Sequence, residues 1–357
     1  MHFKLISHLP LLCLGLAWPL ASPAADYFNI LLYHHISATM PRSTSLTAQE
    51  FEGHLQYLKL NDYHVVDLAA AIELVQQGKP LPEKAVAITF DDAWRDIYMQ
   101  GLPLLKKYGY PFTVFVNTDP VDQNNRHTMT WDMLRDLKQQ GVTLANHTRD
   151  HDYLVRKPVY DESWLTATLD NINYAQQRLT DELGPVPKWL AYPFGEYNDQ
   201  LKRALKQQGY IAFGQQSGGV ADFSDWQALP RFPAAGNYSN LKTLKTKLAS
   251  QPFPANYSAF ANPVIRSDQA EPSQPLLTVE LTKSQKLDVR QQLSCFIVGE
   301  IQMPNWQGKM NFTLQSAKAL GQGRSRYNCT APIWGQNNYY WLSHQWLVYD
   351  GTAPPQE

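Results

Sequence analysis

The sequence predicts an α/β protein with a closed or nearly closed barrel of parallel strands, followed by a small all-β, sandwich-like domain. Three observations lead to this prediction. Short apolar runs alternate with helical patterns over the first 250 residues, and repeated strand–helix units imply parallel strands with helices outside. The apolar runs are continuous rather than alternating, which is typical of a sheet buried on both faces. Beyond residue 275, strand-like segments return without helices between them.

The elements of the barrel follow one another in a regular order. A capping box, Thr47-Ala-Gln-Glu50, predicts the first helix, because Phe51, Leu55 and Leu58 then fall at helical spacing. Strands are expected at 28–33, 63–66, 85–90, 111–116, 142–145 and 189–192, and shorter ones at 210–213 and 228–230. Further helices are expected at 68–75, 94–108, 131–140, 164–183, 201–208 and 241–248.

A change of composition after residue 250 marks the end of the barrel. Prolines lie among small polar residues in 251–275 without a helical period, which predicts a linker or a wrapping tail. The expected organisation is a signal peptide at 1–24, a barrel domain at 26–250, a Pro-rich linker at 251–275 and a β domain at 276–357. Strands of the β domain are expected at 276–281, 287–298, 310–314 and 339–349.

The N-terminus has the pattern of a secretory signal peptide. A charged start precedes the short apolar run 9–18, and small residues follow it, so that cleavage is expected after residue 24 or 25. The run is too short for a membrane span. We therefore expect an exported protein, periplasmic or extracellular, in which Cys295 and Cys329 form a disulfide.

The composition limits the classes of function. The chain has 31 Lys and Arg against 32 Asp and Glu, so its net charge of −1 offers no bulk attraction to nucleic acid. Apolar residues make up 44% of the chain and charged residues 18%, which is an ordinary balance for a globular protein. The aromatic content of 12% suits a core, and it also suits stacking on sugar rings.

Polar residues follow the predicted strands at their carboxyl ends. They include His34 and His35 after the first strand, Asp91 and Asp92 after the third, His147 after the fifth and Arg231 after the last. In a barrel these strand ends meet at one rim, where active sites are built. His147 and His151 with one aspartate would give three metal ligands, which is the pattern of a catalytic zinc-type site. The second aspartate would then act as a general base.

Each of these signals also has a plain structural interpretation. Paired aspartates after a strand are often turn or helix-cap residues. A His-x-x-x-His pair is often two surface histidines. The functional interpretation therefore depends on the whole set, which occupies equivalent strand ends.

Four motifs in this order resemble the polysaccharide deacetylases, the fourth carbohydrate esterase family with its NodB homology domain. They are Thr89-Phe-Asp-Asp92, His147-Thr-x-x-His151, Tyr192-Pro-Phe-Gly195 and Asp222-Phe-Ser-Asp-Trp226. The resemblance covers residues 27–248 and leaves the C-terminal part uncovered. It implies a distorted, incomplete (β/α) barrel, which agrees with the prediction from the elements.

The resemblance implies roles for individual residues. Asp91 would be the catalytic base, and the backbone N–H near Phe194 would contribute to the oxyanion site. Asp92, His147 and His151 would hold a divalent metal, with Zn expected first and Co or Ni as alternatives.

The catalytic acid is implied by Leu32-Tyr-His-His35, which stands near the start of the chain, whereas many members carry such a motif late in the domain. This order is similar to the circularly permuted poly-β-1,6-N-acetylglucosamine N-deacetylases of biofilm systems. By that match His34 is the acid, and His35 is the second choice.

One departure from the family concerns the residue that orients the base. Many members have an arginine where Ala191 stands, and Arg231 is expected to do this work from another strand. Asp222 or Asp225 is expected to orient the acid histidine. Tyr192 and Trp226 are expected to contact the sugar: these two complete the predicted site.

The expected function is therefore that of an exported, metal-dependent polysaccharide N-deacetylase, a hydrolase of carbon–nitrogen bonds other than peptide bonds. Poly-β-1,6-N-acetylglucosamine is the first candidate substrate; peptidoglycan, chitin or an O-acetylated glycan are alternatives. A non-catalytic carbohydrate-binding protein is the alternative from another class. Polysaccharide synthesis or export machinery is a possible partner, and four tryptophans of the C-terminal domain could form a sugar platform or a core.

Overall fold

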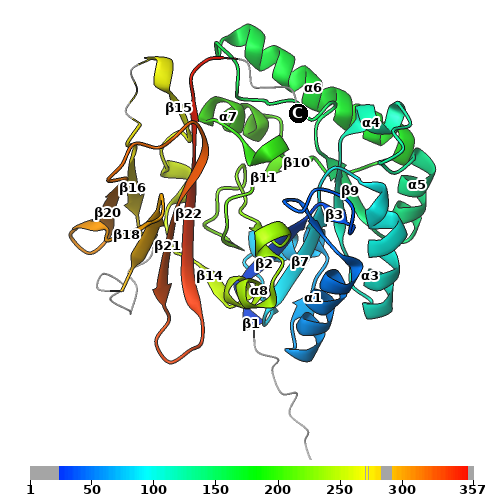
Figure 1. Ribbon diagram of the computed structural model, residues 1–357, viewed down its shortest axis with the longest axis horizontal. Helices are drawn as coiled ribbons and strands as arrows, with labels where there is room; N and C mark the ends of the chain where they lie inside the picture. The colour runs from blue at the N-terminus through cyan, green and yellow to red at the C-terminus, as the bar shows by residue number, and fades with distance from the viewer. Residues whose placement is uncertain (1–23, 270, 272, 283–291, 353–357) are drawn as a thin grey trace, which may run out of the picture.

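The structure is a computed structural model that describes residues 24–269, 271, 273–282 and 292–352 (Figure 1). The predicted signal peptide lies outside the described residues except for its last position, and so does the 287–291 part of one predicted strand. Ala24–Ala25 form β1, which pairs antiparallel with β6 (Leu81–Pro82).

One curled sheet of nine strands forms the centre of the barrel region. Its strands are β2 (Tyr27–Tyr33), β5 (His64–Val65), β7 (Ala85–Phe90), β8 (Thr113–Val116), β9 (Thr143–Asn146), β10 (Trp189–Ala191), β11 (Ile211–Phe213), β12 (Gly219–Ala221) and β13 (Phe232–Pro233). The order is β11-β10-β9-β8-β7-β2-β12, with β13 also beside β2 and β5 beside β7. Every pairing is parallel except that of β12 with β2. In the described chain β11 and β12 do not pair with each other, which confirms the incomplete barrel.

Helices cover the outside of this sheet (Figure 1). They are α1 (Ala48–Leu60), α2 (Leu68–Gln76), the π-helical η1 (Ile97–Gly101), α3 (Leu102–Tyr108), α4 (Thr118–Asp122), α5 (Trp131–Gln139), α6 (Glu162–Leu183), α7 (Asp199–Gln207) and α8 (Leu241–Leu248). The predicted capping box is present, because Thr47 accepts from the Glu50 N–H and the Glu50 side chain accepts from the Thr47 N–H. Trp94 was predicted to be helical, but it forms a bridge with Thr128 beside the site described below.

Short elements complete this region. A two-stranded sheet joins β3 (His35–Ile36) to β4 (Ser45–Leu46), and one-turn helices lie at η2 (Pro193–Gly195), η3 (Gly236–Tyr238), η4 (Tyr257–Ala259) and η5 (Ser267–Gln269). The predicted strand at 228–230 is reduced to a bridge between Leu229 and Phe213.

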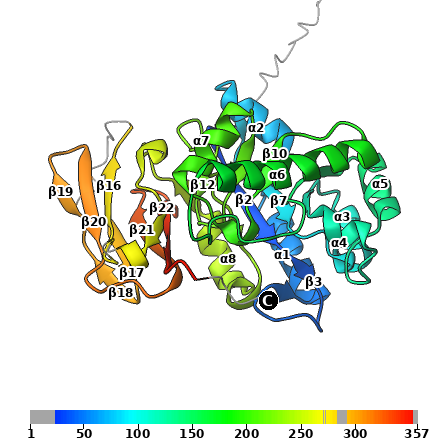
Figure 2. The same ribbon diagram turned by 90° about the horizontal axis from the view of Figure 1, so that it is seen from above.

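The C-terminal region is a sandwich of two sheets around its own core. One sheet contains β14 (Ser250–Pro252), β15 (Val264–Arg266), β17 (Ser294–Ile297), β18 (Glu300–Gln302), β21 (Gly323–Pro332) and β22 (Tyr339–Tyr349). The other contains β16 (Leu276–Glu280), β19 (Asn305–Gln307) and β20 (Asn311–Gln315). Figure 2 shows the first sheet between the second sheet and the barrel.

The stretch 251–275 belongs to this sandwich rather than standing apart from it. Both β14 and β15 pair in parallel with β22, so the chain wraps along the edge of the C-terminal sheet. Of the two interpretations of this stretch, the wrapping tail describes what is observed. The division into domains at the predicted boundaries stays a prediction.

Strand β22 is buried on both faces from residue 342 onward, and this includes a polar stretch at 343–345 in its middle. Leu342 and Val348 lie in the core of the sandwich. Trp341 points the other way and meets Phe232 of the barrel edge-on, with ring centroids 5.5 Å apart. The two regions therefore share a packed interface along one strand.

None of the helices in the described ranges is long and apolar enough to cross a bilayer.

Cys295 and Cys329 form the predicted disulfide between directly paired residues of β17 and β21. The bond closes a loop with a sequence separation of 34. Replacing both cysteines by serine should lower the free energy of unfolding by roughly 3–4 kcal/mol, because the unfolded chain regains the entropy of that loop. Urea denaturation of the oxidised protein and of the double variant measures this difference. Equal denaturation midpoints would contradict the prediction.

Candidate active site

The carboxyl ends of neighbouring parallel strands bring the predicted polar residues to one rim. Tyr33 of β2 is in register with Phe90 of β7, so the next residues, His34 and Asp91, lie level with each other. The Asp91 N–H continues the ladder by donating to the Tyr33 carbonyl at 3.0 Å. His147 follows β9 in the same way, and its N–H donates to the Val116 carbonyl at 2.9 Å.

Asp91 is fully buried and is fixed by Arg231. The guanidinium donates Nη1 to Oδ1 at 2.7 Å and Nη2 to Oδ2 at 2.8 Å, and both side chains are 0% exposed. Its third nitrogen, Nε, donates to the Gly214 carbonyl at 3.0 Å. Burial alone raises the pKa of Asp91, but Arg231 and then His147 outweigh it, so the pKa lies below its ordinary value. A carboxylate held in this way is ionised and has one orientation.

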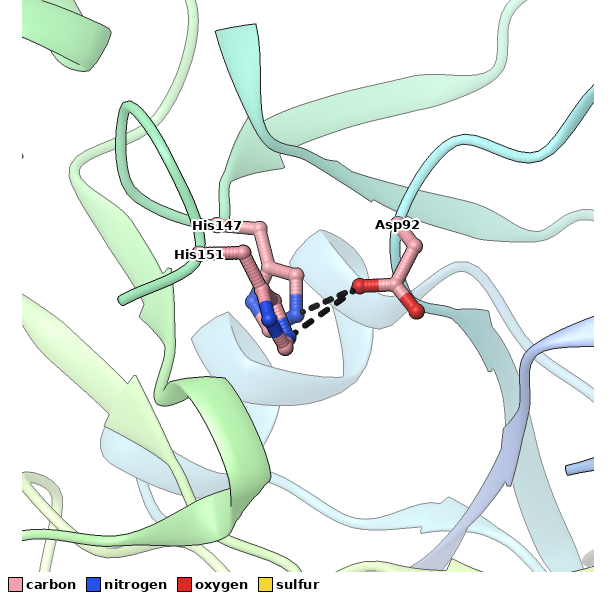
Figure 3. A group of neighbouring side chains, drawn as sticks. All are labelled: Asp92, His147 and His151. Atoms are coloured by element: carbon pink, nitrogen blue, oxygen red, sulfur yellow. Dashed lines mark ion pairs between the residues drawn. The ribbon is translucent and has the colours of Figure 1, made fainter. Parts of the chain in front are cut away.

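Asp92, His147 and His151 form a second group beside Asp91 (Figure 3). Asp92 Oδ1 lies 3.1 Å from His147 Nε2 and 3.4 Å from His151 Nε2. His147 Nδ1 lies 2.7 Å from the Ala191 carbonyl, which can only accept, so Nδ1 carries the proton. In a neutral His147 the Nε2 lone pair therefore faces the Asp92 carboxylate.

A positive charge is needed among these three side chains. Asp92 Oδ1 is buried and accepts no hydrogen bond from the described residues. Burial lowers the pKa of His147, but Asp91 and Asp92 outweigh it, so the pKa is raised. Burial and the neighbouring His147 lower the pKa of His151 to about 4, so His151 is neutral at pH 7 and free to act as a ligand. A single proton could join Asp92 to only one imidazole, whereas a divalent cation could be bound by Asp92 and both imidazoles.

Trp94 holds the remaining oxygen of Asp92, a role that the sequence analysis missed. Its indole Nε1 donates to Asp92 Oδ2 at 3.0 Å, and its ring stacks on His35 with centroids 4.4 Å apart. Such outer contacts fix the orientation of metal-ligating carboxylates. The only signal in the sequence was the position of Trp94, two residues after the aspartate pair.

The two histidines after β2 have different surroundings. His35 is 4% exposed, and its Nδ1 is 2.7 Å from Asp96 Oδ2, which makes it a structural residue beneath Trp94. His34 follows Tyr33 at the rim, level with Asp91, and burial lowers its pKa more than the charges of Asp92 and Asp91 raise it. The role of His34 as the acid stays a prediction.

The turn after β10 lies beside His151, one of the three metal-ligand candidates. Phe194 has φ 58° and ψ 2°, and its N–H has no hydrogen-bond acceptor among the described residues. Its ring stacks on Tyr153, with centroids 4.0 Å apart and planes 13° apart, and meets His151 edge-on at 4.6 Å. Tyr153 follows His151 in the same loop, and its part in this pair was not foreseen.

Backbone strain is concentrated at this rim. Of the nine non-glycine residues with positive φ in the described chain, five belong to the three loops of the site: Asp92, Ala93, Thr148, His151 and Phe194. Each such conformation costs on the order of 1–3 kcal/mol and persists only where the surroundings enforce it. The loops are thus held in fixed shapes before any ligand binds.

Of the two predicted sugar contacts, the one by the Tyr192 side chain is wrong. Tyr192 is 0% exposed, and its hydroxyl donates to the Gln227 carbonyl at 2.9 Å, so it is a core residue. Trp226 is half-buried and packs against the core cluster that includes Leu68 and Trp189. Its carbonyl accepts from the Ala212 N–H in the middle of β11 at 2.9 Å, and its contact with a sugar stays a prediction.

The predicted contact between Asp222 and His34 is also absent from the structure. Strand β12 runs antiparallel to β2, and its last residue, Ala221, pairs with Tyr27 at the first residue of β2. Asp222 therefore lies at the amino end of β2, whereas His34 follows its carboxyl end. Asp225, the other residue considered, is bound by Lys202 at 2.8 Å.

Comparison with known proteins agrees with this geometry. Residues 78–213 match the polysaccharide deacetylase family model, a range that contains Asp91, Asp92, His147 and His151. YxkH of Bacillus subtilis (strain 168), which is named for the same family, is 31% identical over 185 residues. A poly-β-1,6-N-acetyl-D-glucosamine N-deacetylase of Staphylococcus aureus (strain MRSA252) is 27% identical over 214 residues.

These alignments cover part of each chain. The Bacillus alignment spans 51% of this chain and 61% of that protein, and the staphylococcal alignment spans 58% and 73%. Among solved structures, IcaB from Ammonifex degensii has a TM-score of 0.56 at 23% identity and covers 63% of this chain and 97% of its own. The Streptococcus pyogenes deacetylase PplD, in complex with acetate, has the same TM-score and identity and covers 62% and 98%. These two structures show the shared fold.

Proposed function

We propose, from the match of residues 78–213 to the polysaccharide deacetylase family model and from the staphylococcal relative, that the chain removes N-acetyl groups from an exported N-acetylglucosamine polymer. Poly-β-1,6-N-acetylglucosamine is the first candidate. One observation carries the proposal: a buried carboxylate fixed by Arg231 lies next to a second carboxylate that faces two imidazoles.

The three facing side chains fit a divalent metal ion. Asp92, His147 and His151 each offer one ligand atom, and these atoms lie within 4.8 Å of one another. The unpaired Asp92 Oδ1 and the Nε2 lone pair of His147 are two of the three ligand atoms, and a ring nitrogen of His151 is the third. One carboxylate and two imidazoles suit zinc, and cobalt or nickel share this preference.

In the proposed reaction each residue has a separate task. When bound, the metal supplies a Lewis acid near the acetyl group and the attacking water. Asp91 accepts a proton from that water while the water oxygen forms a bond to the acetyl carbon. Arg231 keeps Asp91 ionised and correctly oriented, and the Phe194 N–H donates to the oxyanion that develops.

Breakdown of the amide requires a proton on the leaving nitrogen. His34 is proposed to donate it as the carbon–nitrogen bond breaks, which yields acetate and a free amine. The lowered pKa of His34 makes its protonated form a stronger acid, although a smaller fraction carries the proton at neutral pH.

The choice of substrate is supported by the relative with an assigned polymer and by the aromatic pair at the rim. The staphylococcal protein is named for poly-β-1,6-N-acetyl-D-glucosamine. The stacked rings of Phe194 and Tyr153 adjoin His151, where an apolar sugar face could pack. Acetate release from defined oligomers tests this choice: β-1,6-linked N-acetylglucosamine should react fastest among β-1,6 oligomers, chitin, peptidoglycan and O-acetylated glycan fragments.

Asp92→Asn should abolish stable metal binding. The variant loses the charge of the one carboxylate ligand, so dialysed protein should contain far less than one metal per chain. Added Zn²⁺ at about 100 times its Kd should stabilise the wild type by about 2.7 kcal/mol and leave Asp92→Asn unchanged. Thermal unfolding with and without Zn²⁺ measures this, and Asp152→Asn is the matched control because Asp152 is exposed in the same loop as His151. Equal Zn²⁺ stabilisation of both variants would remove Asp92 from the ligand set.

Export is proposed from two features. The first 24 residues have the pattern of a signal peptide, and the described chain contains a disulfide, which persists in oxidising compartments. The protein would therefore meet its polymer outside the cytoplasm, next to the machinery that makes or exports it.

A further inference from the structure

The turn that carries the Phe194 N–H is held from outside the barrel. Gln345 of β22 donates its Nε2 to the Gly195 carbonyl at 2.6 Å, and this side chain is 4% exposed. Arg324 of β21 donates Nη1 to the Phe194 carbonyl at 2.6 Å. Two consecutive peptide planes of the turn are thus bound by the C-terminal sheet.

Arg324 also lies close to the side chains of this turn. Its guanidinium carbon is 5.7 Å from the centre of the Phe194 ring, and its Nε is 3.6 Å from the Glu196 carboxylate. Glu196 is 1% exposed and is bound from the barrel side by Arg156, with Nε at 2.9 Å. The carboxylate therefore ties the end of the turn to both regions.

The strand register explains why these two donors act together. Gln345 pairs with Arg326 across β21 and β22, and Arg324 pairs with Leu347. Directly paired residues and those two positions away share a face of the sheet. Arg324 and Gln345 are therefore diagonal neighbours on the face that covers the barrel.

The turn needs such support because its own contacts are few. Phe194 and Gly195 both have positive φ, and a Cβ on Gly195 would lie 2.8 Å from the Gln215 nitrogen. Within the turn, the Gly195 N–H donates to the Tyr192 carbonyl at 2.8 Å and the Glu196 N–H donates to the Pro193 carbonyl at 3.1 Å. Among the described residues of the barrel, no backbone N–H donates to the Phe194 or Gly195 carbonyl. A non-glycine residue in this conformation relaxes unless its surroundings hold it.

We propose that the C-terminal sandwich is a positioning part of the active site, in which Gln345 and Arg324 hold the 193–196 turn in its productive shape. The inference rests on the proposed function, because the turn matters through the Phe194 N–H. Gln345 and Arg324 are positioning residues, because they act on the turn and touch neither the metal ligands nor Asp91. The sandwich would then be required for turnover even on a short soluble substrate.

The test compares Gln345→Met and Arg324→Met, which keep side-chain volume and remove the donors. Because an oxyanion contact acts in the transition state, kcat should fall about tenfold with KM unchanged, which is less than the ~10²–10³ expected for complete loss of such a donor. Metal content should stay at the wild-type value. Arg324→Lys keeps a donor and should recover most of the loss. Arg326→Met is the matched control, because Arg326 lies on the same face directly opposite Gln345, and no hydrogen bond or ion pair among the described residues joins it to the turn.

Hydrogen exchange of the peptide that covers residues 193–198 gives a readout independent of activity. Both Met variants should exchange faster there and should match the wild type elsewhere, which also shows that they fold. Faster exchange in a preparation whose wild type releases no acetate would support the positioning role and refute the proposed function. Unchanged exchange, or faster exchange with unchanged kcat, would overturn the inference. An equal loss of activity in Arg326→Met would also overturn it, because the effect would then be general to the interface.

Discussion

Asp91→Asn is expected to lower acetate release by about 10²–10⁴-fold, the range that a positioned general base contributes. Asparagine has nearly the same shape, but it cannot accept a proton at neutral pH. Metal content should remain at the wild-type value, because Asp92, His147 and His151 are unchanged. The measurements are acetate release under saturating substrate and metal analysis of the same dialysed sample.

The variant also leaves Arg231 without its counter-ion, so its fold must be checked. Circular dichroism and thermal unfolding at the assay temperature serve that purpose. Asp96→Asn is a matched control: Asp96 is a carboxylate near the rim that binds His35 and lies outside the proposed chemistry. Asp91→Asn protein that is folded, contains metal and retains more than a tenth of the wild-type rate would exclude Asp91 as the base.

The positions of the chemistry could be predicted because they follow from strand ends. A buried apolar strand that leads into Asp91 and Asp92 has few explanations, and parallel strands necessarily bring their carboxyl ends together. The pairing of Asp91 with Arg231 was also foreseen, although the two are 140 positions apart. That expectation came from the family resemblance, since nothing in the spacing of the residues connects them.

The contacts that tune the site could not be predicted. The Ala191 carbonyl sets the tautomer of His147, and a backbone carbonyl has no identity in a sequence. Tyr192 belongs to a family motif, but its side chain points into the core, since a motif does not tell which way a strand residue faces. Asp222 was misplaced because β12 has only three residues and runs antiparallel, and so short a strand carries no signal of direction.

The role of the C-terminal region could not be predicted from the sequence for a similar reason. Strand β21 reads as polar, with Arg324, Arg326 and Asn328, because its side chains meet the barrel and solvent rather than a uniform core. Such a pattern resembles a loop until the partner surface is known. The four tryptophans of this region also differ in their surroundings. Trp346 is 2% exposed, Trp341 packs on Phe232 and Trp306 packs on Phe312, whereas Trp334 is 69% exposed.

Arg231→Met is expected to destabilise the metal-free protein by about 3–5 kcal/mol at neutral pH, the usual cost of leaving one member of a buried ion pair alone. Arg231 and Asp91 are both 0% exposed, so water cannot compensate the carboxylate. Activity should fall as well, because burial then favours the protonated form of Asp91, which is no base. Urea denaturation in the presence of a chelator measures the loss of stability.

The pH dependence and a double variant separate this cause from a loss of packing. In the wild type the lowered pKa of Asp91 contributes stability above the ordinary aspartate pKa of about 4, and this contribution is lost as the pH falls through the folded-state pKa. In Arg231→Met the pKa of Asp91 is raised instead, so that variant gains relative stability as the pH falls. The difference in the free energy of unfolding between the wild type and Arg231→Met should therefore become smaller from pH 7 towards pH 4. Asp91→Asn/Arg231→Met removes both charges and should recover most of the lost stability while remaining inactive. A gap that is independent of pH and unchanged in the double variant would mean that Arg231 stabilises through its volume rather than its charge.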